Sequence, residues 1–157
     1  MNKLLKMLLT TSLVLGSAAT PVFADQPGKH PAYLHALTDL RSARSKLERR
    51  KGDAEVRWDE SRAIADIDAA IRKIKEAAVD DGKNLEDHPP RDAREPYVGR
   101  LHRALADLKA AHADVAREED NEFAQGLKHR ALKDIDAAML RTREGLCNAG
   151  NKEFCDE

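Results

Sequence analysis

The chain has 157 residues, of which 35% are charged, with 27 Lys and Arg against 28 Asp and Glu. This balance gives no basic patch for a phosphate backbone, so nucleic-acid binding is not expected. Aromatic residues make up 4% of the chain, too few for the stacking platforms that hold bases.

Residues 1–24 have the organisation of a secretory signal peptide. Lys3 and Lys6 supply a positive start, an apolar run follows to Thr20, and Val22-Phe23-Ala24 suits a signal peptidase. The run is too short to span a bilayer comfortably, so it predicts export to the periplasm or outside the cell. Cleavage after Ala24 would leave residues 25–157, a single domain without a transmembrane segment.

Two helical hairpins are predicted, at residues 31–78 and 101–147. In both, apolar residues recur every three or four positions, as on the buried face of a bundle helix. The first hairpin is expected to turn at Lys51-Gly52-Asp53, with Asp53 as the N-cap of its second helix, and Asp120 or Asn121 is the candidate N-cap in the second hairpin. The fold class predicted is all-α, a four-helix bundle.

The two hairpins resemble each other at a constant offset of 68 residues. ALTDLRSAR, from Ala36 to Arg44, matches ALADLKAAH, from Ala104 to His112, and the same offset matches RAIADIDAAI, from Arg62 to Ile71, with RALKDIDAAM, from Arg130 to Met139. One gapless offset across two helices indicates an internally duplicated helix–loop–helix unit.

Residues 79–100 join the hairpins, and Pro89-Pro90 cannot lie inside a helix. This linker is either a functional loop or a crossover along the bundle.

The C-terminal tail, residues 147–155, contains both cysteines in CNAGNKEFC. In an exported protein, Cys147 and Cys155 are expected to form a disulfide that staples the tail locally. The spacing is neither the C-x-x-C of a redox enzyme nor the C-x-x-C-H of covalent haem attachment.

The repeated aspartates, Asp66 and Asp134, each follow an arginine by four residues, Arg62 and Arg130. One helical turn separates the members of each pair, so ion pairing on the helix surface, extended between helices or not, is the expected role. The alternative is a carboxylate cluster that binds a metal between helices. A di-iron centre is not expected, because no Glu-x-x-His motif occurs.

Histidines give a second candidate site. Imidazole binds divalent transition metals, and the histidines could gather at one end if the first helices of the two hairpins were parallel. The candidate metal ligands are His30, His35, Asp39, His88, His102 and His112. His112 and Met139 also fall in apolar seams, where a b-type haem is an alternative to the expected core role.

Catalysis is not expected. Residues 25–157 contain only Ser42, Ser45 and Ser61 as serines, and none lies in a Gly-x-Ser-x-Gly motif. With both thiols expected to be oxidised, the sequence offers no nucleophile–base pair.

The chain resembles a group of small exported bacterial helical proteins of unassigned function. The resemblance rests on GKHPAYLHALTDLR, IDAAIRKIKEAAVDDGKNLEDHPP and GRLHRALADLKAAHADVAREEDN, and it carries no site residues. The function predicted is therefore that of a non-catalytic periplasmic or secreted bundle without a cofactor, which binds an unknown protein or envelope partner or buffers envelope stress. A metal- or haem-binding bundle is the alternative.

Overall fold

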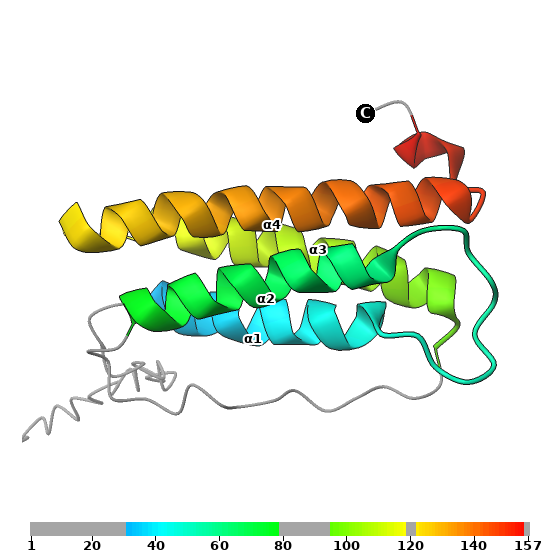
Figure 1. The fold of residues 1–157 in the computed structure, drawn as a ribbon, viewed down its shortest axis with the longest axis horizontal. Helices are drawn as coiled ribbons and strands as arrows, with labels where there is room; N and C mark the ends of the chain where they lie inside the picture. The colour runs from blue at the N-terminus through cyan, green and yellow to red at the C-terminus, as the bar shows by residue number, and fades with distance from the viewer. Residues whose placement is uncertain (1–30, 79–94, 119–121, 156–157) are drawn as a thin grey trace, which may run out of the picture.

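The structure is a computed structural model that describes residues 31–78, 95–118 and 122–155. The described part is all-helical, and its four long helices form a bundle, as predicted (Figure 1). The elements are α1 (Pro31–Leu47), α2 (Glu60–Ala77), α3 (Tyr97–Arg117), α4 (Glu122–Asn148) and the short 3₁₀ helix η2 (Lys152–Phe154). No helix in these ranges is long and apolar enough to cross a membrane.

The helices pack mainly across the two hairpins. The most extensive contacts join α1 to α3 and α2 to α4, and those within the hairpins, α3 to α4 and α1 to α2, are smaller. The α1 and α3 helices are antiparallel, because the Ala32 amide donates to Glu118 Oε2 at 2.8 Å and the Tyr97 hydroxyl donates to the Leu47 carbonyl at 3.2 Å. Each helix therefore packs closely against its counterpart from the other hairpin.

Alanine explains this close packing. Fully buried alanines recur every seventh residue in each of the four helices, and such small side chains let antiparallel helices approach closely. They are Ala36 and Ala43, Ala63 and Ala70, Ala104 and Ala111, and Ala131 and Ala138. Larger apolar residues, such as Leu40, Ile67, Leu108 and Ile135, fill the space between them.

The buried positions repeat at the same 68-residue offset as the sequence. Leu40 and Leu108 are both fully buried, as are Ile67 and Ile135. Burial is also retained at one position where the residue type changes: Thr142 takes the place of Ile74, and its hydroxyl donates to the Ala138 carbonyl at 2.8 Å. That hydrogen bond satisfies a polar group in a position otherwise occupied by an apolar side chain.

The loop of the first hairpin is longer than predicted. The N-cap of α2 is Asp59, whose side chain accepts from the Ser61 amide at 3.2 Å, so the prediction of Asp53 as N-cap is wrong. Asp53 instead accepts from the Arg50 amide at 2.6 Å, inside the loop. Gly52 has a φ of 93°, a conformation that favours glycine, and it makes this turn possible.

The α3 helix begins earlier than predicted. It starts at Tyr97 after Pro96, so the last four residues assigned to the linker are helical. Tyr97 and Arg100 are both buried, and this packing accounts for the extension. The end of α2 and the start of α3 lie at opposite ends of the bundle (Figure 1).

Candidate functional site

The candidate metal ligands that lie within the described residues do not converge on one site. His35 is on the first turns of α1 and His102 is near the start of α3, and the antiparallel packing of these helices places the two histidines towards opposite ends. The parallel arrangement that would have gathered them is wrong. Two other candidates, His30 and His88, lie outside the described residues.

The described histidines have separate surroundings. His102 Nε2 lies 3.4 Å from Asn151 Oδ1, and its ring meets Phe154 edge-on with 5.4 Å between ring centroids. His112 Nε2 lies 3.3 Å from a carboxylate oxygen of Asp136 on α4. His112 is partly exposed at the edge of the core rather than buried in it, whereas Met139 packs against the core as expected. Within residues 31–78, 95–118 and 122–155, no group of three or more His, Cys, Asp or Glu side chains could hold a metal ion.

The repeated aspartates bridge helices. Asp66 of α2 pairs with Arg141 of α4 at 2.6 Å, and Asp134 of α4 pairs with Lys73 of α2. These two pairs exchange under the 68-residue offset, as expected of two hairpins related by an approximate twofold rotation. Arg62 pairs with Asp59 at 3.1 Å rather than with Asp66. Both aspartates therefore form ion pairs between helices, one of the two possibilities that the sequence left open, and not with the arginine four residues earlier in the same helix.

A buried arginine closes one end of the bundle, and the sequence patterns did not predict it. The Arg100 side chain is only 1% exposed; its Nη1 donates to the Glu48 carbonyl at 3.0 Å and its Nη2 donates to Asp53 Oδ2. Burial alone would raise the pKa of Asp53, but hydrogen bonds from the Arg50 amide and the Arg100 guanidinium outweigh burial and lower that pKa below its ordinary value. Arg100 therefore ties the loop of the first hairpin to the first turn of α3.

Tyr97 lies at the centre of the same bundle end. Its ring is flanked by the guanidinium carbons of Arg49 and Arg100, at 4.9 and 5.0 Å from the ring centroid. Its hydroxyl accepts from Trp58 Nε1 at 3.2 Å while it donates to the Leu47 carbonyl. Burial raises the pKa of Tyr97, so this hydroxyl stays protonated at neutral pH. We name Trp58, Tyr97, Arg49, Arg100 and Asp53 the end cluster.

Trp58 of the end cluster requires glycine at position 145. A Cβ atom at Gly145 would lie 2.8 Å from the indole ring of Trp58, closer than any real contact of that kind. The residue 68 positions earlier is Ala77, so glycine here is specific to the second hairpin.

Replacing Gly145 with alanine is therefore expected to displace Trp58 from α4 and expose its ring to water. Trp58 is the only tryptophan of the chain, so the displacement should appear as a red shift of the intrinsic fluorescence maximum. The matched control is Gly126→Ala on the same helix, where the nearest atom is the flexible end of Arg130 at 3.5 Å. An unchanged Gly145→Ala emission spectrum would contradict the tight packing.

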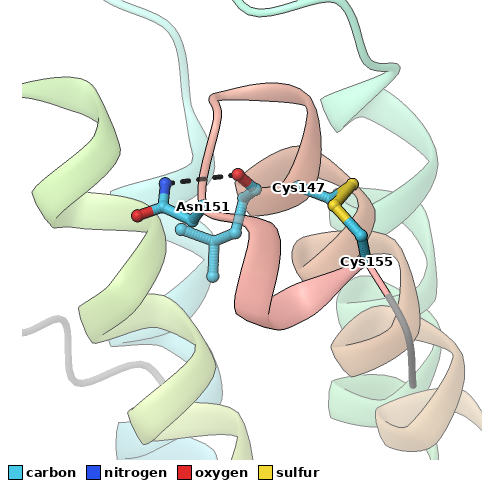
Figure 2. The surroundings of a disulfide bond; sticks show 4 residues. Cys147, Asn151 and Cys155 are labelled. Atoms are coloured by element: carbon cyan, nitrogen blue, oxygen red, sulfur yellow. Dashed lines mark hydrogen bonds between the residues drawn. A yellow bond between two sulfur atoms is a disulfide. The ribbon is translucent and has the colours of Figure 1, made fainter.

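The C-terminal tail folds back at the same end. Cys147 of α4 is bonded to Cys155, as predicted, and Asn151 Nδ2 donates to the Leu146 carbonyl at 3.2 Å inside the loop (Figure 2). Phe154 packs against the core and meets His102 of α3. The tail thus connects the last turn of α4 with the beginning of α3.

The purified oxidised protein is expected to contain no free thiol, because both cysteines are used in this bond. Alkylation of the denatured, unreduced protein followed by mass spectrometry should find no modified cysteine, and prior reduction should give two. Two modified cysteines without prior reduction would show that Cys147 and Cys155 do not form a disulfide.

The structure brings together two sets of residues that the sequence treated separately, the loop of the first hairpin and the C-terminal tail. Sequence reasoning found the cysteines but missed Tyr97, Arg100 and Trp58. A usable signal was present, since Arg100 lies one turn before Ala104 on the apolar stripe of α3, where a charged residue is unexpected. The chain matches no protein-family model, and comparison with curated proteins and with solved structures likewise gives no match.

Proposed function

We propose that this protein is an exported, non-catalytic four-helix bundle of the periplasm or the extracellular space, which acts by binding another component of the cell envelope. We also propose that its two hairpins arose by duplication. The 68-residue relation between the ion pairs Lys73–Asp134 and Arg141–Asp66 supports the duplication.

The hydrogen bonds of Tyr97 and Arg100 support a binding role over a catalytic one, because these polar groups bind other residues of the chain. The hydroxyl of Tyr97 is held between Trp58 and Leu47, and both Nη atoms of Arg100 are hydrogen-bonded to other residues of the chain. Groups held in this way rigidify an end of the bundle, and a rigid scaffold is what a binding surface needs.

The observation that carries the proposal is the position of the non-repeated segments. The loop of residues 48–59 differs in structure from its counterpart under the offset, residues 116–127, most of whose described part is helical, and the tail of residues 149–155 follows the second hairpin. Both segments are built on the bundle end that contains the start of α3. Binding residues are often found in loops that a rigid scaffold positions. We therefore place the binding surface at this end.

Site-specific photo-crosslinking in intact cells tests this surface. A photoreactive residue at the exposed positions Arg57 or Glu153 should give a discrete crosslinked product, whereas the same residue at Arg72 or Lys133, which are exposed on α2 and α4, should not. Equal crosslinking from all four positions, or none from the first two, would contradict the proposed surface.

The metal or haem alternative has its own test. The visible spectrum and the metal content of the mature protein purified from the periplasm are expected to show neither a Soret band nor a stoichiometric metal. Either one would overturn the proposed function. The described residues give this alternative no particular support, since His35 and His102 lie towards opposite ends of the bundle.

A further inference from the structure

The interface between α1 and α3 contains a broken repeat. Lys46 of α1 forms an ion pair with Asp107 of α3, and both side chains are mostly buried. Under the 68-residue offset, Lys46 corresponds to Asp114 and Asp107 corresponds to Asp39. The twofold relation therefore sets two carboxylates, Asp39 and Asp114, at the place that is equivalent to an ion pair.

The other cross-hairpin interface has no such break. Between α2 and α4, Lys73–Asp134 and Arg141–Asp66 are both retained, with a cation and a carboxylate in each. The change of one lysine to an aspartate thus affects the α1–α3 interface alone, in its half nearer the start of α1.

Asp39 is partly buried, and two helices supply the charges around it. The Asp107 and Asp114 carboxylates of α3 act on it electrostatically, as do His35 and Lys46 of its own helix. Lys46 is paired with Asp107, and Asp114 is paired with Arg117, a side chain that is 67% exposed. Burial, followed by repulsion from Asp107 and Asp114, raises the pKa of Asp39, and the favourable effects of His35 and Lys46 do not offset this.

We propose that the Asp39–Asp114 carboxylate pair makes the contact between α1 and α3 acid-responsive: the pair weakens this contact when both groups are ionised, and the contact is strengthened when the pair takes up a proton. For an exported protein this contact would couple the tightness of the bundle to the acidity of its surroundings. The proposal does not depend on the binding role, because it concerns the folding equilibrium of the isolated protein.

The sign of the effect follows from proton linkage. The pKa of Asp39 in the folded protein is raised above 3.8, so the folded state takes up this proton first as the pH falls. Stability is therefore gained as the pH falls through the folded value, and the gain is complete below 3.8. Asp53 and Asp59 have lowered pKa values, so their contributions are lost only at still lower pH. The gain should therefore appear as the pH is lowered from neutral towards 3.8, before the contributions of Asp53 and Asp59 are lost.

Thermal unfolding of the full mature chain, followed by circular dichroism across this pH range, tests the proposal. The melting temperature of the wild type should rise as the pH falls. Asp39→Asn removes the repulsion without changing size, so it should raise the melting temperature at pH 7.5 by roughly 1–3 °C and weaken its pH dependence. Asp107→Asn is the matched control at the same interface: it also removes a charge that repels Asp39, but it breaks the ion pair with Lys46, so it should lower the melting temperature.

Two further variants keep the test decisive. Asp114→Asn should act like Asp39→Asn if the latter fails to fold, and Asp114→Lys should raise the melting temperature more than either, because it restores the twofold-related ion pair with Asp39. A wild-type melting temperature that stays flat or falls on acidification, or an Asp114→Lys variant that melts below the wild type, would overturn the proposal.

Discussion

Replacing Arg100 with alanine should lower the free energy of unfolding by about 2–4 kcal/mol, the range expected when one partner of a buried ion pair is removed. The Arg100 side chain is 1% exposed and that of Asp53 is 12% exposed. Without Arg100, the mostly buried Asp53 carboxylate keeps only the Arg50 amide as a donor, and the Glu48 carbonyl loses the hydrogen bond from Arg100. Tyr97 also loses one of its two flanking guanidinium groups. Urea unfolding monitored by circular dichroism measures the change.

Arg103→Ala is the matched control, one turn further along α3. Arg103 pairs with Glu95 at 2.8 Å, but its side chain is 60% exposed, and exposed pairs contribute little, about 0–1 kcal/mol. If the two variants had equal stabilities, Arg100 would not be the group that ties the first loop to α3.

Replacing a buried alanine between α2 and α4 with leucine should lower the free energy of unfolding by the same amount in both hairpins. Ala70 and Ala138 are related by the 68-residue offset and are both fully buried. Ala70→Leu and Ala138→Leu should each lower the free energy of unfolding by about 1–3 kcal/mol, because the added carbon atoms force the tightly packed helices apart. Urea unfolding of the two single variants measures the costs.

The control for this pair is Ala65→Leu, at an exposed position of α2, which should leave stability nearly unchanged. A large cost at one of the two buried alanines and none at the other would contradict the equivalence of the hairpins.

The sequence predicted the helices well because their apolar stripes are regular. Leu40, Leu108, Ile67 and Ile135 are at the core as their spacing indicates, and the start of α1 at Pro31 is as predicted. The alanines at the closest contacts were visible in the same pattern. Helical period specifies which face is buried, and this part of the fold depends on little else.

The spacing of apolar residues does not predict whether α1 and α3 are parallel or antiparallel. A stripe of leucine and alanine packs equally well against a parallel or an antiparallel neighbour. The sequence pattern therefore does not specify whether His35 and His102 lie at the same end of the bundle. The turn at Lys51-Gly52-Asp53 predicts an N-cap at Asp53, because aspartate is a preferred N-cap residue. Its partner, Arg100, is 47 residues away, and local sequence does not reveal a contact at that distance.

The antiparallel packing of α1 against α3 determines which residues pair across the two hairpins, separates His35 from His102 and places Asp39 opposite Asp114. Double electron–electron resonance tests it directly, with nitroxide labels on cysteines introduced at the exposed positions 35 and 117 in one sample and 35 and 103 in another. The distance expected for the first pair is shorter than that for the second, because positions 103 and 117 are separated by roughly 20 Å along α3 at the rise of an α-helix per residue. The reverse order of distances would show that the helices are parallel and would contradict the account.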